Sequence, residues 1–229
     1  MLRIVLFDFD GVIVDSELVH YTFIRQTLRN EGLDLNWKDY CDKYLVYDDF
    51  TAFRKILGDQ DRHENDDFIR YLCENKTELY DDYIASNAMV YPGVAELLLE
   101  LAESNILISI YSGSLRNEIE EILEQAGLLG YFLDIVTVED VKMPKPDPEG
   151  YVLAMKKASA HLNAKGTIQP EDCIVIEDST LGVHAAKEAG MHCLAVETSY
   201  SSDMLGHADH VVKDLTEVNT ALLKRIVEP

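Results

Sequence analysis

Residues 4–12, Ile4-Val5-Leu6-Phe7-Asp8-Phe9-Asp10-Gly11-Val12, decide the fold of this chain. Four consecutive apolar residues that end at turn formers predict a short strand buried on both faces, as in a parallel sheet. Open α/β sheets carry their chemistry at the carboxyl ends of such strands, which is where Asp8 and Asp10 lie. Residues two apart on an extended chain face the same side. We therefore expect both carboxylates to point into one site, where one can attack while the other moves a proton.

Three further segments place polar side chains after a predicted strand or before a predicted helix. The apolar run 106–111 ends in Ser-Gly-Ser, the run 174–176 ends in Glu-Asp-Ser, and Lys145 precedes a helical pattern. A lone Asp-x-Asp-Gly sequence is as compatible with a simple turn as with a site, because Asp and Gly dominate turns. The added hydroxyls, lysine and carboxylates favour a site, since turn chemistry does not predict that set.

Together these segments resemble the four motifs of the haloacid dehalogenase superfamily. The resemblance is to its branch of capped phosphatases and β-phosphoglucomutase-like enzymes, which carry a helical cap after the first motif. Nearly the whole chain takes part, and the matching residues are Asp8-Phe9-Asp10-Gly11-Val12, Asp15-Ser16-Glu17, His20, Ser112-Gly113-Ser114, Lys145-Pro146-Asp147-Pro148, Tyr151, Glu177-Asp178-Ser179, Gly182-Val183 and Ala189-Gly190-Met191. Pro144 departs from the pattern, because the family more often has Gly before the lysine.

The residues at these positions suit the hydrolysis of a phosphate monoester. Asp8 would attack phosphorus and form an aspartyl-phosphate. Asp10 would protonate the leaving oxygen and then activate water as a base. The family gives these roles to the matching positions. Lys145 would offset negative charge, and backbone N–H groups before a helix form an anion site. The expected catalytic residues are Asp8, Asp10, Ser112 and Lys145, and the expected phosphate-binding residues are Ser112, Gly113, Ser114 and Lys145. Helix N-capping is a competing role for Ser114.

The crowding of carboxylates at one strand end also predicts a metal ion. Such groups repel one another unless a hard cation lies between them, and Mg²⁺ prefers a few oxygen ligands together with waters. We expect Mg²⁺ as the cofactor, bound by Asp8, by the backbone carbonyl of Asp10 and by Asp178. Glu177 is expected either as a ligand or directly behind the ligands.

Three residues of the predicted cap are candidates for substrate binding: His20, Arg54 and Lys76. Lys76 lies on the same helical stripe as Leu72 and Tyr80, which is unusual for a residue that prefers water. The family's caps often carry a basic residue at the corresponding place. The alternatives are a packing role for His20, a surface position with a buried stem for Lys76, and simple solvation for Arg54.

Composition limits the partners. The chain has 229 residues and a formal net charge of −22, which argues against nucleic acid and anionic membranes because their recognition needs clustered Lys and Arg. The four cysteines show no metal-ligand spacing, which is typical of free thiols in a reducing compartment. The apolar run near Met1 is too short for a signal peptide. We expect a cytoplasmic protein, a monomer or weak homodimer, whose partner is a small phosphorylated metabolite.

The periodicity predicts two domains. Strands near residues 4–7, 106–111, 135–138, 174–176, 194 and 211–212 alternate with helices near 94–101, 115–123, 148–162 and 215–227, a pattern that implies a parallel sheet. Helical stripes run through residues 19–28, 53–57 and 69–83, with a polar stretch at 58–67. The predicted fold class is α/β. A Rossmann-like catalytic core (1–15 and 90–229) carries an inserted all-helical cap (16–89).

The sequence favours a Mg²⁺-dependent phosphatase of a small phosphorylated metabolite, such as a sugar phosphate or phosphoglycolate. The alternative is a β-phosphoglucomutase-like phosphoryl transferase. A mutase must hold a second phosphate in its cap, and the cap segment 46–50 is acidic, which favours hydrolysis. A catalytically idle binding or regulatory protein is a further alternative, but its mark would be a lost nucleophile, lysine or metal carboxylate, and all are intact.

Overall fold

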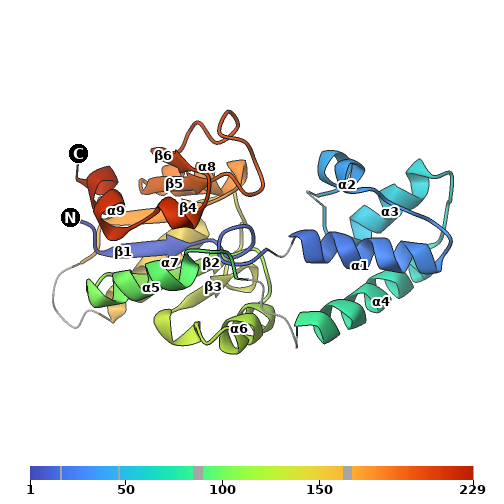
Figure 1. Cartoon of the computed structure of the whole chain (residues 1–229), viewed down its shortest axis with the longest axis horizontal. Coiled ribbons are helices and arrows are strands. Elements are labelled where there is room, and N and C mark those ends of the chain that lie inside the picture. The colour runs from blue at the N-terminus through green and yellow to red at the C-terminus, as the bar shows by residue number, and fades with distance from the viewer. Residues whose placement is uncertain (16, 46, 85–89, 162–166, 229) are drawn as a thin grey trace. The chain divides into compact units, whose positions relative to one another are not determined.

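The computed structural model describes residues 1–15, 17–45, 47–84, 90–161 and 167–228. The chain forms two compact units, one made of Met1–Asp15 with Ala88–Pro229 and the other of Ser16–Asn87 (Figure 1). We call the first the core unit and the second the cap unit. The chain passes between them beside a short antiparallel bridge of Val14 with Val90.

The core unit is built on one sheet of six parallel strands in the order β3-β2-β1-β4-β5-β6. The strands are β1 (Ile4–Phe7), β2 (Leu107–Ser112), β3 (Ile135–Thr137), β4 (Cys173–Glu177), β5 (His192–Val196) and β6 (His210–Val212). All four residues of β1 are buried, as their unbroken apolar run predicts. The sheet confirms the predicted α/β class.

The register brings the carboxyl ends of three strands together. Phe7 of β1 pairs with Ile110 of β2 and Ile176 of β4, and the Asp8 N–H donates to the Ile176 carbonyl at 2.9 Å. Segments that follow these strands therefore meet at one edge of the sheet. This is why residues more than a hundred positions apart can form one site.

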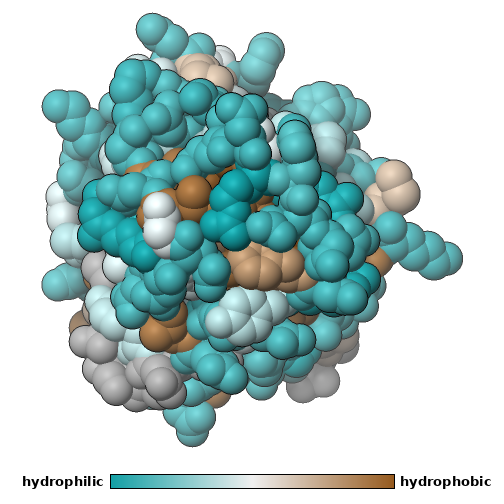
Figure 2. Space-filling view, turned by 90° about the vertical axis from the view of Figure 1, so that its right-hand side faces the viewer, coloured by the Kyte–Doolittle hydropathy of each residue, from teal (hydrophilic) through white to brown (hydrophobic). Residues whose placement is uncertain are grey.

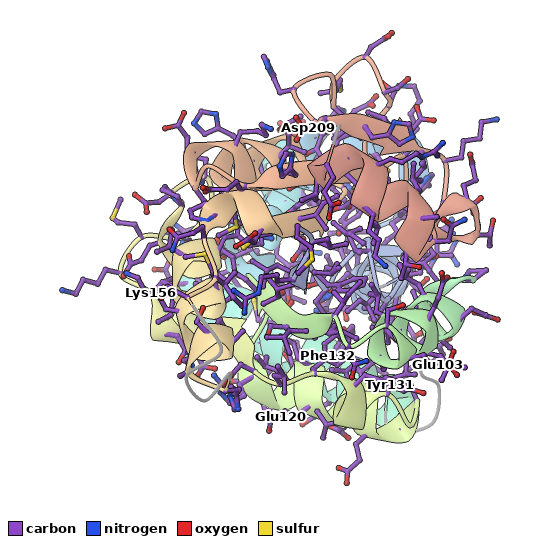
Figure 3. All side chains as sticks on the ribbon, turned by 90° about the vertical axis from the view of Figure 1, so that its left-hand side faces the viewer. Glu103, Glu120, Tyr131, Phe132, Lys156 and Asp209 are labelled. Atoms are coloured by element: carbon purple, nitrogen blue, oxygen red, sulfur yellow. The ribbon has the colours of Figure 1, made fainter. Side chains whose placement is uncertain are left out.

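Helices of the core unit pack against the sheet. The core helices are α5 (Val94–Glu103), α6 (Arg116–Gln125), α7 (Glu149–Ala160), α8 (Thr180–Glu188) and α9 (Thr220–Val227). Helices α7 and α8 share an apolar cluster with Ile4 and Leu6 of β1, whereas α5 and α9 contact each other and reach β2, β4 and β5. Phe132, labelled in Figure 3, packs edge-on against Phe7 with ring centroids 6.3 Å apart.

Two predicted elements differ from those observed. The helix expected over 215–227 is broken into a 3₁₀ turn, Leu215–Glu217, and α9, because Asn219 caps α9 by accepting the Leu222 N–H at 2.9 Å. The first helical residue after β2 is Arg116, with Leu115 as its N-cap, so Ser114 lies before the cap and does not fill the capping role considered for it.

The cap unit is helical throughout its named elements, α1 (Glu17–Asn30), α2 (Trp37–Lys43), α3 (Asp49–Asp59) and α4 (Asp66–Ile84). The cap unit has an apolar core of its own, which includes Ile24, Phe53 and Leu72, and a separate core is typical of an independent domain. The ends predicted for this domain, at 16 and 85–89, lie outside the described residues. The polar stretch predicted at 58–67 is shorter, because α3 runs to Asp59 and α4 begins at Asp66.

Figure 2 shows one face of the molecule, on which most side chains are hydrophilic and a smaller number of apolar ones lie between them. All four cysteines are free thiols, two of them buried. Among the described helices, none combines the length and the apolar character that a membrane span requires.

Candidate active site

Asp8 occupies the first position after β1 and is buried, with 7% of its surface exposed. The chain then turns sharply, since the N–H groups of Ile13 and Val14 both donate to the Phe9 carbonyl. Gly11 makes this turn possible with a φ of +75°, and a Cβ there would lie 1.9 Å from Asp178 Oδ2. The turn thus brings the backbone of the first motif against the carboxylate of the last.

Three acidic side chains of the site, those of Asp8, Glu177 and Asp178, are called here the acidic group, and Lys145 contacts two of them. Its Nζ lies 2.8 Å from Asp8 Oδ1 and 2.6 Å from Glu177 Oε1. The same ammonium lies 5.2 Å from the ring centroid of Tyr111 and 5.4 Å from that of Tyr151. Two carboxylates and two aromatic faces therefore surround a lysine that is only 13% exposed.

Five donors contact the fully buried Glu177 carboxylate. Its Oε1 accepts from Lys145 and from the Tyr151 hydroxyl at 2.8 Å. Its Oε2 accepts from the Asp178 N–H, the Ser179 N–H and the Ser179 hydroxyl at 2.9–3.0 Å. Ser179 is also the N-cap residue of α8, so the same side chain begins this helix and hydrogen-bonds to Glu177.

The electrostatics of the carboxylates follow from burial and from Lys145. Burial raises the pKa of Asp8 well above its usual value, and Lys145 opposes this. Burial and the neighbouring Glu177 raise the pKa of Asp178 to about 7. Burial would also raise the pKa of Glu177, but Lys145 and the hydrogen bonds hold it below its usual value. Asp8 and Glu177 in turn raise the pKa of Lys145 against the effect of burial, so the ammonium stays charged.

The same group fits a divalent cation. Carboxylate oxygens of Asp8, Glu177 and Asp178 lie within 4.8 Å of one another, and all three residues are buried. Of these carboxylates only Asp8 and Glu177 contact Lys145, so three buried acidic side chains share one lysine and carry a surplus of negative charge. A hard cation with oxygen ligands would remove this surplus, so the donor set suits Mg²⁺.

The hydroxyls of Ser112, the last residue of β2, and of Ser114 contact the second aspartate of the first motif. Ser114 donates to Asp10 Oδ2, and Ser112 Oγ lies 3.5 Å from the same oxygen. Ser112 Oγ also accepts the Ser114 N–H at 3.0 Å. The structure therefore brings Ser112 and Ser114 to Asp10, and in this arrangement the Ser114 N–H has an internal partner.

Sequence reasoning missed two neighbours of the site in the segment after β5. The Ser199 hydroxyl hydrogen-bonds to Asp178, and the Thr198 hydroxyl donates to the Gly11 carbonyl at 2.5 Å. It also assigned no site role to Tyr111. Thr198 and Ser199 follow a predicted strand at its carboxyl end, which is the signal that could have found them.

In the cap unit, the structure brings together Lys76 and His20 but not Arg54. Lys76 is 3% exposed, and its Nζ lies 2.9 Å from Asp49 Oδ2, 2.7 Å from His20 Nδ1 and 4.6 Å from the Tyr80 ring centroid. Lys76 is thus buried rather than at the surface. Arg54 is half exposed, pairs with Asp66 at 2.5 Å and covers the ring of Phe50.

A buried aspartate after a central parallel strand, a lysine between two carboxylates and three buried acidic side chains within 4.8 Å of one another are the arrangement expected of a class of phosphoryl-transfer enzymes. Residues 5–196 match the family described as haloacid dehalogenase-like hydrolases, and the chain belongs to this family. The match confirms the resemblance seen in the motifs.

Relatives cover nearly the whole chain. A β-phosphoglucomutase of Bacillus subtilis (strain 168) is 30% identical over 97% of this chain and 94% of its own. A validoxylamine A 7'-phosphate phosphatase of Streptomyces hygroscopicus subsp. limoneus is 28% identical over 95% and 96%. The crystal structure of a HAD family hydrolase from Deinococcus radiodurans R1, with bound phosphate and sodium, has a TM-score of 0.80 and 25% identity, covering 100% of this chain and 98% of that one. The family, described as hydrolases, and the relatives named as phosphatases support a phosphoric monoester hydrolase.

Proposed function

We propose that this chain is a Mg²⁺-dependent phosphatase that hydrolyses a small phosphorylated metabolite, of the sugar phosphate or phosphoglycolate type, through an aspartyl-phosphate. The observation that carries the proposal is the contact of Asp8 with Lys145 at 2.8 Å, at the carboxyl end of the central strand. A carboxylate held there beside a cation suits attack on an anionic phosphoryl group. The relative named as a phosphatase of validoxylamine A 7'-phosphate supports a small phosphorylated substrate.

The residues of the site account for each proton and bond. In the first step Asp8 attacks phosphorus, the bond from phosphorus to the leaving oxygen breaks, and protonated Asp10 gives its proton to that oxygen. In the second step Asp10 takes a proton from water, which attacks the aspartyl-phosphate and frees phosphate and Asp8. Lys145 binds the phosphoryl oxygens together with the Ser112 hydroxyl and the Gly113 N–H, and the Ser114 N–H joins them only by leaving Ser112 Oγ, its partner here at 3.0 Å.

Asp8, the backbone carbonyl of Asp10 and Asp178 would hold Mg²⁺. Bound there, the ion would neutralise charge on the phosphoryl oxygens and on the nucleophile. Five donors already contact Glu177, so we assign it the position behind the ligands, where it binds Lys145. The Ser199 hydroxyl interacts with Asp178 and lowers its pKa, which favours the charged carboxylate that a metal ion needs.

A second candidate, supported by the β-phosphoglucomutase relative, is transfer of the phosphoryl group within a sugar phosphate. That reaction needs a free cation in the cap for a second phosphate. In the cap unit Lys76 pairs with Asp49, and Arg54 pairs with Asp66, so internal carboxylates neutralise both candidate cations. This pairing favours hydrolysis. With β-glucose 1-phosphate and a bisphosphate primer we expect phosphate release without accumulation of glucose 6-phosphate; coupled detection of glucose 6-phosphate at a higher rate would establish the mutase.

The nucleophile is tested by Asp8→Asn, which keeps the shape of the side chain but cannot form the acyl-phosphate. We expect no turnover of p-nitrophenyl phosphate from a protein whose circular dichroism shows that it is still folded. The control is Asp203→Asn, which removes an exposed carboxylate of the core unit and should retain full activity. Mass spectrometry of acid-quenched wild-type enzyme should find one phosphoryl group on the peptide that contains Asp8. Turnover by Asp8→Asn at a near wild-type rate would refute the assignment.

A further inference from the structure

The groups that surround the Lys145 ammonium determine its position. Lysine has a flexible four-carbon stem, so its charge takes the position that its neighbours define. Here those neighbours are Asp8 Oδ1, Glu177 Oε1 and two tyrosine rings. Glu177 is the nearest of them to Nζ, at 2.6 Å.

Glu177 Oε1 is shared between Lys145 and Tyr151. The Tyr151 hydroxyl donates to it at 2.8 Å, and Tyr151 is fully buried in the first turn of α7. Burial and Glu177 raise the pKa of Tyr151 well above its usual value, so the phenol remains a donor at neutral pH. The backbone after β4 fixes Oε2, so the carboxylate cannot rotate away from either partner.

A carboxylate oxygen accepts along two lone-pair directions. Tyr151 occupies one of them, which leaves Lys145 the other. The Tyr151 ring also stands edge-on to Tyr111, with centroids 4.9 Å apart and an interplanar angle of 88°, so the hydroxyl has little freedom to move.

We propose that Tyr151 is a positioning residue for phosphoryl transfer: its hydroxyl holds one side of Glu177 Oε1 and thereby directs the Lys145 ammonium toward Asp8. The proposal rests on the proposed function, because it assigns Lys145 to the phosphoryl group. Without the hydroxyl, Oε1 has a free direction in a buried site, and the ammonium shifts toward it to satisfy both lone pairs. The contact with Asp8 then lengthens.

The test is Tyr151→Phe, which keeps the ring beside the ammonium and removes only the hydroxyl. We expect kcat to fall about 10- to 100-fold and KM to change less than about threefold, because a displaced charge affects the transition state more than binding. Vanadate, which imitates the five-coordinate phosphorus, should inhibit more weakly by a factor similar to the loss in kcat. The inhibition constant of phosphate should change less than about threefold. Inhibition constants do not depend on the fraction of active enzyme, so partial unfolding would leave both unchanged.

The matched control is Tyr44→Phe. Tyr44 is also buried and donates its hydroxyl to a carboxylate, Asp59 at 2.6 Å, but it belongs to the cap core. It should lose a similar amount of stability without losing kcat or vanadate affinity.

A double-mutant cycle with Glu177→Gln tests whether Tyr151 acts through Glu177. In the Glu177→Gln background, Tyr151→Phe should lower kcat by less than about threefold, because the charged oxygen on which it acts is gone. An equal loss in both backgrounds, or vanadate and phosphate inhibition unchanged in Tyr151→Phe, would overturn the proposal. If wild-type enzyme hydrolyses no phosphate monoester, the proposed function fails instead, so the two failures are distinguishable.

Discussion

Replacing Gly182 by Ala should displace Glu177 and so disrupt the acidic group, although α8 itself contains none of the three acidic residues. Gly182 is the third residue of α8 and lies directly against Glu177. A Cβ at this position would be 1.7 Å from Oε1, 1.9 Å from Cδ and 2.3 Å from Oε2. Ordinary contact between carbon and oxygen needs well over 3 Å, so the carboxylate has to move by about 1.5 Å.

The magnitude follows from the bonds that such a movement breaks. Lys145 at 2.6 Å and Tyr151 at 2.8 Å both bond to the oxygen that is displaced most. A hydrogen bond to a charged group contributes about 1.5–3 kcal/mol, and Ala favours a helix over Gly by up to about 1 kcal/mol. The net loss in the free energy of unfolding is therefore about 2–5 kcal/mol. For a domain of this size that lowers the melting temperature by roughly 4–20 °C.

The assay is thermal unfolding together with phosphatase kinetics. The control is Gly58→Ala, also in a helix, where a Cβ would have no neighbour within 4 Å. This control should be neutral or stabilising by up to about 1 kcal/mol, with full activity. We expect Gly182→Ala to lose kcat by at least about tenfold, because Lys145 loses its partner. A melting temperature and kcat equal to those of the wild type would refute the packing argument.

Three further outcomes test the metal site and the cap. Activity should be lost in EDTA, return with Mg²⁺ and be inhibited by excess Ca²⁺, whose longer and more numerous oxygen bonds would engage both oxygens of Asp8; full activity in EDTA would contradict the metal site. The pKa of Asp178 is raised to about 7, so the proton-bound carboxyl prevails below that pH and competes with the ion. The Mg²⁺ concentration for half-maximal binding, measured by calorimetry, should rise about tenfold from pH 8 to pH 6, and an equal value at both would show that Asp178 is not a ligand. Leu72→Ala in the cap core should cost about 2–5 kcal/mol in denaturant unfolding, whereas Tyr71→Ala, at a half-exposed neighbour, should cost much less; equal losses would mean that the cap has no packed core of its own.

The local pattern of the chain was sufficient for the fold class. An apolar run such as Ile4–Phe7 cannot remain in water, and its length suits a buried strand but not a helix. Alternation of strands with helices then requires parallel pairing, and β1 lies at the centre of the observed sheet. The same reasoning placed Asp8 and Asp178 at one edge, because the carboxyl ends of parallel strands share an edge whatever the side chains between them. Lys145, which precedes a helix, was placed with them by the resemblance to the family's motifs.

The sequence also contains local signals for two features that were not predicted from it, the break before α9 and the polar pair after β5. Asn219 is an N-cap residue three positions before Leu222, and it marks the break in the predicted helix 215–227. The Thr198-Ser199 pair follows β5 as the other polar pairs follow their strands. These features are local, and a stricter reading of caps and strand ends would have predicted both.

Other features depend on which faces meet, and only the tertiary structure decided them. Tyr151 reaches Glu177 because α7 packs over β1 and β2, and sequence spacing does not fix the angle at which a helix crosses a sheet. Lys76 looked like a cation available to substrate, yet the packing of α3 against α4 gives it Asp49 as a partner. A pattern of periodic residues determines which side of an element is buried. The partner of a buried polar group is determined by long-range packing, which brings one particular acceptor within 3 Å and excludes the rest.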